Sequence, residues 1–304
     1  MKNLKQRTIQ INPNAVGLLG FASVEVPPSR IEFPGQKNLM ESFRTISQTQ
    51  PGLVSHGLGY VLKDIGVRDN KIKEISEALF SLIENLSGQR ASLEQLEFEC
   101  KRFIADAIPN TTENIDMALS NRARIIFNQV SGFVQGSSVL DLGAGDGKVG
   151  ALLQVESGFD VYLADVMELA DNTCMGLPFF LYDGMTLPFS DQSYDTTLLL
   201  TVLHHADEPL RVLEEAIRVT RKRIIIIESV YFTEEHRTFN MFLDWFYNRI
   251  LHDSVNCPFN FQSPLGWELT FKRHKLKISG SLNLGLDQRV VPEYHWLYLL
   301  DVIR

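Results

Sequence analysis

The chain has 304 residues, of which 44% are hydrophobic and 22% charged, an ordinary composition for a globular protein. Its formal net charge of −8 argues against nucleic acid and anionic membrane surfaces as partners, since both bind positive patches. No apolar stretch approaches the length of a membrane span, and three cysteines without metal-ligand spacing favour a reducing, cytoplasmic setting.

Residues 1–110 predict an irregular arm followed by a helical extension. Four prolines indicate that residues 1–36 form the arm. Apolar residues then recur at helical spacing over 72–86, and Gly88 is predicted to cap that helix. Ser92 with Gln95 forms a capping box for a second helix, so we expect a helical hairpin. It could serve as a lid or packing extension, as a homodimer surface or as a docking site for another protein.

Residues 115–134 predict a long helix that leads into the first strand, and the run VLDLGAGDG follows at 139–147. Asp141 ends a short apolar strand, and the glycines at 143, 145 and 147 come directly after it. Such a turn carries no side chains where a ligand lies against the backbone. The helix expected from Lys148 would direct its N-terminal N–H groups at that ligand.

The glycine spacing favours a nucleoside cofactor that has no pyrophosphate. A dinucleotide fingerprint has apolar residues at the place of Asp141, and its third glycine would fall at Lys148. A shifted G-x-G-x-x-G nevertheless occurs at Gly145, Gly147 and Gly150. A nicotinamide-dependent Rossmann oxidoreductase therefore remains an alternative, as does a turn whose glycines serve packing alone.

Four further apolar runs predict strands of one parallel sheet. The second, 161–165, ends in Asp165, an acid placed to bind ribose hydroxyls, and the third ends in Asp183. Only thirteen residues separate Asp165 from Phe179, which is room for about one helical turn. The fourth strand leads into Leu203-His204-His205, and a helix at 210–217 precedes a fifth strand that ends in Glu228. Continuous apolar strands alternating with helices predict a doubly wound α/β fold.

Over residues 137–230 these features resemble the class I S-adenosylmethionine-dependent methyltransferases of the small-molecule type, the type 11-like group with LPF and LHH signatures. The resemblance implies a Rossmann-like seven-stranded sheet in a domain over residues 111–304, with S-adenosyl-L-methionine as cofactor. It also implies a set of cofactor-binding residues: Asp141, Gly143, Ala144, Gly145 and Gly147 in the first motif, Asp165 and Val166 at the ribose, Asp183, Gly184 and Met185 at the adenine, and Leu200 and Thr201 near the methionine portion.

An aromatic-rich insertion over 231–271 contains eleven aromatic residues and leaves the carboxyl end of the fifth strand. Ligands of open α/β sheets bind beyond these strand ends, so we expect the insertion to cover a small apolar or aromatic acceptor. The alternative is that most of these rings pack in a helical core. A hairpin of 277–284 with 295–302 is expected to end the fold.

His205 is the favoured catalytic residue, as a base toward an acceptor hydroxyl, with His204 and Glu228 as further candidates. His252, Asp253 and His295 are weaker candidates because nothing fixes their position. Both histidines of the LHH run could instead only shape the pocket. A divalent-metal mechanism is not expected, because the sequence shows no Asp-Asp-Asn cluster. O-methylation is expected, with carbon and nitrogen acceptors open and a non-catalytic methyltransferase-like subunit as an alternative.

Overall fold

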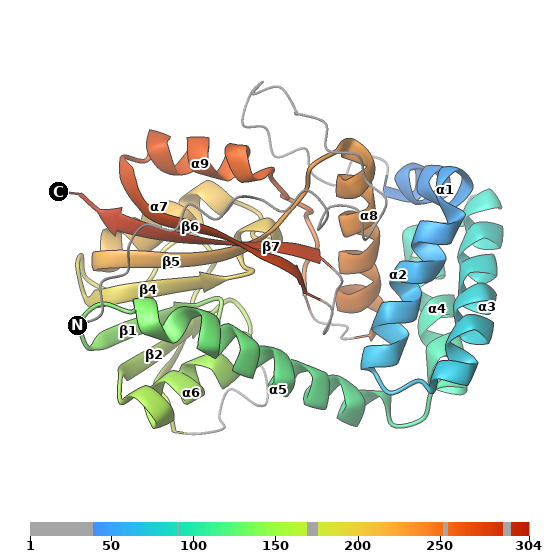
Figure 1. Cartoon of the computed structure of the whole chain (residues 1–304), viewed down its shortest axis with the longest axis horizontal. Coiled ribbons are helices and arrows are strands. Elements are labelled where there is room, and N and C mark those ends of the chain that lie inside the picture. Colours follow the sequence, from blue (N-terminus) through green and yellow to red (C-terminus); the bar gives the residue numbers. More distant parts are fainter. Residues whose placement is uncertain (1–38, 90, 169–175, 252–254, 288–292, 304) are drawn as a thin grey trace.

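The computed structural model describes residues 39–89, 91–168, 176–251, 255–287 and 293–303. A twisted sheet with helices on both faces forms one end of the molecule, and a cluster of helices forms the other (Figure 1). The predicted arm at 1–36, most of the short link after Asp165, and His252 and Asp253 lie outside the described residues.

Seven strands form the sheet in the order β3-β2-β1-β4-β5-β7-β6, and β7 runs antiparallel to both of its neighbours. This mixed sheet is the predicted doubly wound α/β fold, and the expected final hairpin of β6 with β7 is confirmed. The strand bounds are β1 Ser138–Leu142, β2 Asp160–Asp165, β3 Phe179–Leu181, β4 Tyr194–Leu200, β5 Thr220–Val230, β6 Leu276–Asp287 and β7 Glu293–Val302.

The apolar runs form strands because alternate residues bury against two different helical layers. Ile225 and Ile227 of β5 face the layer that contains α5 (Thr111–Val130) and α6 (Lys148–Ser157). Ile224 and Ile226 face the opposite layer, which contains α7 (Pro209–Val219) and α9 (Pro264–Arg273). A strand covered on both faces needs apolar side chains at every position, which explains the continuous hydrophobic pattern.

The helical cluster at the N-terminal side consists of α1 (Leu39–Thr49), α2 (Pro51–Asp64), α3 (Asp69–Gly88) and α4 (Leu93–Ala107). Ser92 accepts the N–H of Gln95 at 3.2 Å, as the capping box predicts. The prediction that Gly88 caps the preceding helix was wrong. The N–H of Gln89 still bonds the carbonyl of Asn85 at 3.1 Å, so α3 continues through Gly88.

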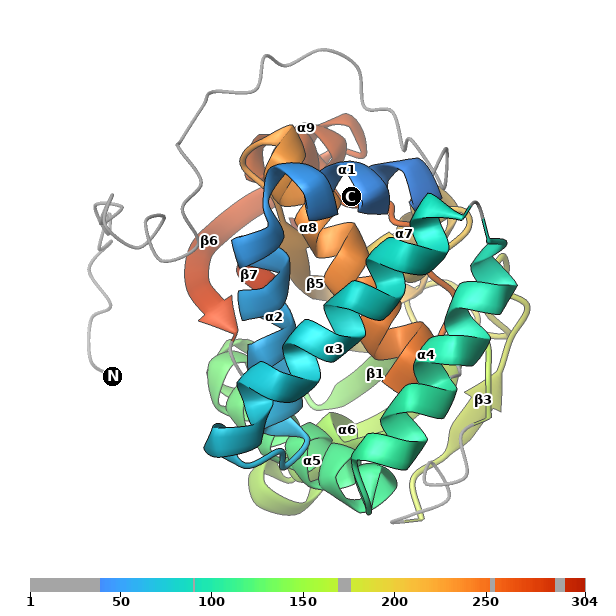
Figure 2. The same ribbon diagram turned by 90° about the vertical axis from the view of Figure 1, so that its right-hand side faces the viewer.

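This cluster packs on α8 (Glu234–Trp245), which lies between it and the sheet (Figures 1 and 2). The ring of Phe43 in α1 lies 5.3 Å from that of Phe242 and 4.9 Å from that of Trp245. A π-helix, Phe246–Leu251, continues α8, and the 3₁₀ turns are Ser131–Phe133 and Leu203–His205. Buried residues of the cluster, α8 and one sheet face form one continuous core.

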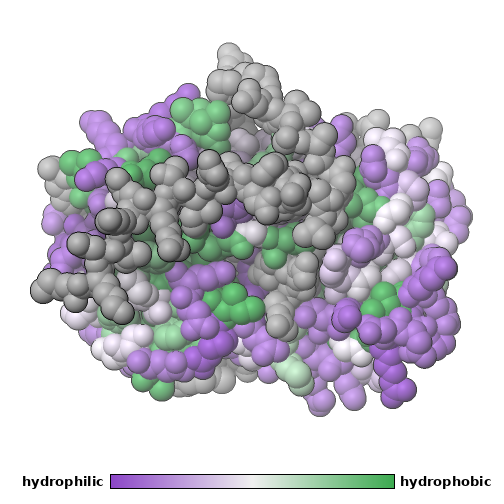
Figure 3. Space-filling view, viewed as in Figure 1, coloured by the Kyte–Doolittle hydropathy of each residue, from purple (hydrophilic) through white to green (hydrophobic). Residues whose placement is uncertain are grey.

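The surface over the helical cluster is mostly hydrophilic on the face seen in Figure 3. Within the part of the chain that the structure describes, no helix has the length and apolar character needed to cross a bilayer.

Candidate active site

The loop after β1 is built by glycines that a side chain would disrupt. Gly143 has φ +74°, and a Cβ there would lie 2.5 Å from Cγ2 of Val202. Gly145 also has positive φ, +54°, but a Cβ there would meet nothing within 4 Å, so the loop has open space beside it. The backbone can therefore approach a ligand closely at this turn.

Gly147 is the N-cap of α6, with φ +71°, and a Cβ there would lie 2.8 Å from Leu163. The helix begins at Lys148 as expected. Gly147 does not line the cavity, so its prediction as a cofactor contact is not supported. A glycine is needed at this position because the backbone is left-handed and because α6 packs closely on β2.

Asp165 ties the ends of two strands together. From the end of β2 its carboxylate accepts N–H groups from Gly145 (2.8 Å), Val166 (2.7 Å) and Met167 (3.2 Å). Burial raises its pKa, and these three N–H groups oppose the shift. The side chain thus stands beside the glycine loop with its charge held by backbone donors.

Asp141 lies beneath the same loop and is 2% exposed. Burial first, and then the charges of Asp165 and Asp146, raise its pKa to about 7, against the opposing N–H of Gly150.

Asp183, by contrast, is on the rim after β3. It accepts the N–H groups of Met185 (2.8 Å) and Thr186 (2.7 Å), which lower its pKa.

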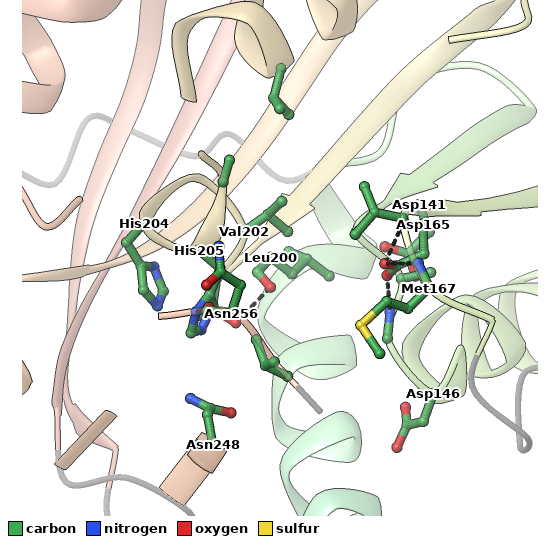
Figure 4. A pocket seen from close by; sticks show the side chains of 18 of the residues that line it. Asp141, Asp146, Asp165, Met167, Leu200, Val202, His204, His205, Asn248 and Asn256 are labelled. Carbon is green, nitrogen blue, oxygen red and sulfur yellow. Dashed lines mark hydrogen bonds between the residues drawn. The ribbon is translucent and has the colours of Figure 1, made fainter. Parts of the chain in front are cut away.

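A cavity of about 600 Å³ opens over these groups at the carboxyl ends of β1, β2 and β4. Its size is in the range of small-molecule sites. Asp141 and Asp165 lie on one side of it and His204 and His205 on the other (Figure 4). Among the described residues of its wall one is an arginine, Arg122, and eight are acidic: Asp141, Asp146, Asp165, Asp183, Asp207, Glu208, Asp244 and Glu293. Such a wall favours a ligand with positive charge.

Glu228 holds the histidine turn from below. Its Oε2 lies 2.6 Å from Nδ1 of His204, and its Oε1 accepts the N–H groups of Leu203 (2.7 Å) and Val202 (3.0 Å). Burial raises the pKa of Glu228 to about 7 and lowers that of His204 to about 4. Glu228 is fully buried and does not line the cavity, although it bonds the turn that carries both histidines, and its catalytic role stays a prediction.

His205 is on the cavity wall, with 19% of its side chain exposed. Its Nδ1 lies 2.9 Å from the carbonyl oxygen of Asn256, and its Nε2 lies 3.5 Å from Oδ1 of Asp244. A carbonyl oxygen only accepts, so Nδ1 carries the hydrogen and Nε2 of the neutral ring has the lone pair. Burial lowers the pKa of His205.

The far wall of the cavity consists of residues that were not predicted from the sequence. Asp244, Tyr247 and Asn248 reach it from α8 and the π-helix, and Asn256 from the segment that follows. One face of α5 completes it, with Leu119, Arg122, Ala123 and Ile126. That face could have been found from its i, i+3, i+4, i+7 spacing, whereas the other groups depend on how the insertion folds.

Most aromatic rings of the insertion pack in the core, which confirms the alternative expectation for them. All eleven aromatic residues of 231–271 are in the described part of the chain, and Tyr247 alone among them lines the cavity. The others pack in the core, as Phe242 and Trp245 do against Phe43. Several polar groups also line this part of the cavity. They are Ser229, Asp244, Asn248, Asn256, Glu293 and His295.

Together, the sheet order, the glycine loop and the acids at the strand ends define a Rossmann-like nucleoside-cofactor fold. Residues 140–227 match the family model described as "Methyltransferase domain". A demethylmenaquinone methyltransferase of Renibacterium salmoninarum is 28% identical over 162 residues, which cover 50% of this chain and 66% of that protein. The O-methyltransferase rstn1 of Aspergillus nomiae is 31% identical over 125 residues, which cover 37% of this chain and 54% of that protein.

A solved structure of a SAM-dependent methyltransferase from Aquifex aeolicus is also similar, with 18% identity over 60% of this chain and 89% of that chain and a TM-score of 0.42. The chain spans less than two thirds of the length of both curated relatives. Residues 140–227 thus match a methyltransferase domain, in support of a class I S-adenosylmethionine-dependent methyltransferase, a class whose cofactor is S-adenosylmethionine.

The residues present fit this cofactor. Open space beside Gly145 admits a ligand against the loop, and the acidic wall suits a molecule with a sulfonium and an ammonium group. Apart from Gly147, every residue predicted to bind the cofactor lies on the cavity wall. Their individual contacts remain predictions.

Proposed function

We propose that the chain transfers the methyl group of S-adenosylmethionine to a hydroxyl oxygen of a small, uncharged acceptor. The observation that carries this proposal is one cavity that joins the glycine loop and Asp165 to a polar compartment around His205. The curated relatives add support, since one of them is named an O-methyltransferase. The acidic wall disfavours an anionic acceptor.

Bound S-adenosylmethionine supplies an electrophilic methyl group on its sulfonium sulfur. The protein's own groups then have two tasks, to hold the acceptor oxygen in line and to activate its hydroxyl. The polar groups of Asn248, Asn256 and His295 are placed to orient the acceptor. The acceptor loses one proton and gains one methyl group, and the cofactor leaves as S-adenosylhomocysteine.

We propose His205 as the residue that activates the acceptor. The Asn256 carbonyl fixes the Nδ1–H tautomer, and burial keeps the ring neutral, so a lone pair on Nε2 is available. This lone pair can receive the hydroxyl proton directly or bind a cation that acidifies the hydroxyl. Asp244, 3.5 Å away, stabilises positive charge at that nitrogen.

The test is methyl transfer from cofactor with a labelled methyl group to a panel of phenols and hydroxyquinones. His205→Ala should lower turnover at least about 100-fold, with affinity for S-adenosylhomocysteine changed less than about twofold. His274→Ala, a partly buried histidine whose Nε2 is 3.9 Å from Glu214 and which lies away from the cavity, is the matched control. Unchanged turnover in His205→Ala would remove this residue from the reaction.

A ring-carbon acceptor is the second candidate, because the first relative is named a demethylmenaquinone methyltransferase. The chemical shift of the transferred carbon in the product separates the two, since a methyl ether and a ring methyl differ widely. An ether signal supports the first proposal.

We further propose that residues 1–110 act as a packing extension over the site, and that residues 111–304 form the methyltransferase domain with an insertion over 231–271. Support comes from α1, α2 and α4, which contact α8 and the π-helix that carry Asp244 and Tyr247. A homodimer through these helices stays a prediction, which sedimentation of the full chain would test.

A further inference from the structure

Two histidines and one carboxylate converge at the acceptor end of the cavity. One ring nitrogen of His204, one of His205 and one carboxylate oxygen of Asp244 all lie within 4.8 Å of one another. The turn Leu203–His205 supplies both imidazoles, and α8 supplies the carboxylate. Asp244 is 2% exposed, and the Nδ2 of Asn248 donates to its Oδ1 at 2.7 Å.

The hydrogen bonds around this cluster bring two acceptor atoms close together, the Nε2 of His205 and the Oδ1 of Asp244, which are 3.5 Å apart. His205 donates from Nδ1 to the Asn256 carbonyl, so its Nε2 is an acceptor. The Nδ1 of His204 lies 2.6 Å from Oε2 of Glu228, so Nε2 is its ring nitrogen on the other side from that carboxyl group. Asp244 only accepts when ionised. Close acceptors of this kind repel unless a positive charge lies between them.

We propose that His204, His205 and Asp244 bind one divalent transition-metal cation. Two imidazole nitrogens and one carboxylate oxygen are ligands typical of Zn²⁺ and Fe²⁺ sites with open positions, whereas Mg²⁺ and Ca²⁺ prefer oxygen ligands. Each imidazole has a partner on its other nitrogen, Glu228 for His204 and the Asn256 carbonyl for His205. Such outer partners orient metal-bound histidines and fix their tautomer.

One of the three separations in the cluster already fits a bound cation, and all three are within 4.8 Å. Ligands about 2.0–2.2 Å from one tetrahedral cation are about 3.3–3.6 Å apart, and the Nε2 of His205 lies 3.5 Å from Oδ1 of Asp244. The other separations would shorten on binding.

The charges around the cluster also favour a cation. The wall of the cavity also carries the acidic side chains of Asp207 and Glu293, and Arg122 opposes their charge from α5.

Three protein ligands leave further positions of the cation open to the cavity. A hydroxyl bound there would have a lowered pKa, so the cation would activate the acceptor and His205 would act as a ligand rather than as the base. This role rests on the proposed methyl transfer, whereas metal binding itself does not.

The experiment uses the full chain after dialysis against a chelator. Titration with Co²⁺ should give visible d–d absorption that saturates at one equivalent, and Zn²⁺ should displace Co²⁺ while Mg²⁺ should not. Asp244→Asn and His205→Gln should weaken Co²⁺ binding at least about tenfold, a typical effect of disturbing a metal site. His274→Ala is the control, and S-adenosylhomocysteine binding by each variant shows that it is folded.

Absence of saturable Co²⁺ absorption, or equal affinity in the folded variants, would overturn the metal site. A chelated protein that keeps full methyl transfer would overturn the activating role while leaving the proposed function intact. One bound metal with no methyl transfer to any acceptor would instead support the site and count against the proposed function.

Discussion

At the scale of single residues, buried carboxyl groups dominate this site. Asp141 and Glu228 are at most 2% exposed, and burial raises the pKa of each to about 7. Burial is the largest cause of both shifts. Their ionisation therefore costs free energy in the cofactor-free protein, which a cationic ligand would offset.

Asp141→Asn should change how the stability of the cofactor-free protein depends on pH. The folded pKa of Asp141, about 7, lies above the ordinary value of 3.8, so its contribution is complete below pH 4 and is lost as the pH rises toward and through 7. The Asn side chain does not ionise, so the variant does not lose this stability as the pH rises. Its free energy of unfolding, relative to the native protein, should rise by a few kcal/mol between pH 4 and pH 8, at about 1.4 kcal/mol per unit of pKa.

Urea unfolding at pH 5 and pH 8 measures this difference. Asp106→Asn, at an exposed acid on α4, controls for the change in net charge. A difference between Asp141→Asn and the native protein that stays constant with pH would contradict the predicted shift.

At the scale of elements, the loop after β1 depends on glycine for two separate reasons, backbone conformation and space. Gly143 requires both, since it has φ +74° and packs against Val202. Gly158, the C-cap of α6, has φ +71° with open space around it. A comparison of substitutions at Gly143 and Gly158 therefore distinguishes the cost of steric contact from the cost of backbone strain.

Gly143→Ala should destabilise the protein more than Gly158→Ala and should also weaken cofactor binding at least about tenfold. Both variants carry the strain of a left-handed residue, about 1 kcal/mol, but only the first forces Val202 out of position beside the ligand. Thermal unfolding and calorimetry with S-adenosylhomocysteine measure the two effects. Equal affinity in both variants would show that Val202 yields without cost to the site.

The strands and acids of the core could be predicted from sequence because each is fixed by local pattern. Apolar runs form strands covered on both faces, and the acids stand at their carboxyl ends. No element was predicted over 39–64, where α1 and α2 form. Three glycines in α2 lower its helix propensity, and Gly57 is needed because a Cβ there would lie 2.7 Å from Phe239. Asp244 and Asn256 reach the site through tertiary packing, so the spacing of residues in the sequence does not predict their position.

At the scale of the whole molecule, the helical cluster and the sheet hold α8 between them. Glu97 of α4 makes a central contact, accepting from Nε1 of Trp245 at 3.0 Å and pairing with Arg249 at 3.1 Å. Both partners lie on the segment that also carries Asp244 and Tyr247. The position of the cavity wall formed by Asp244 and Tyr247 thus depends on helices far from the glycine loop.

Glu97→Ala should lower the free energy of unfolding by about 1–3 kcal/mol, because the buried indole N–H of Trp245 loses its acceptor. Glu99→Ala is the matched control, since Glu99 forms a surface pair with Arg102 on the same helix and should cost under about 1 kcal/mol. Urea unfolding gives both values. A loss in Glu97→Ala no larger than in the control would show that the cluster does not fix α8 through this contact.

We predict that S-adenosylmethionine binds in the cavity through the glycine loop and Asp165. Calorimetric titration with S-adenosylhomocysteine tests it most directly, with NAD⁺ and NADP⁺ titrated in parallel. We predict one S-adenosylhomocysteine per chain, no saturable binding of either dinucleotide, and affinity reduced about 10–100-fold in Asp165→Ala, equivalent to about 1.5–3 kcal/mol for a charged hydrogen-bond partner. Saturable binding of a dinucleotide without any binding of S-adenosylhomocysteine would contradict the claim.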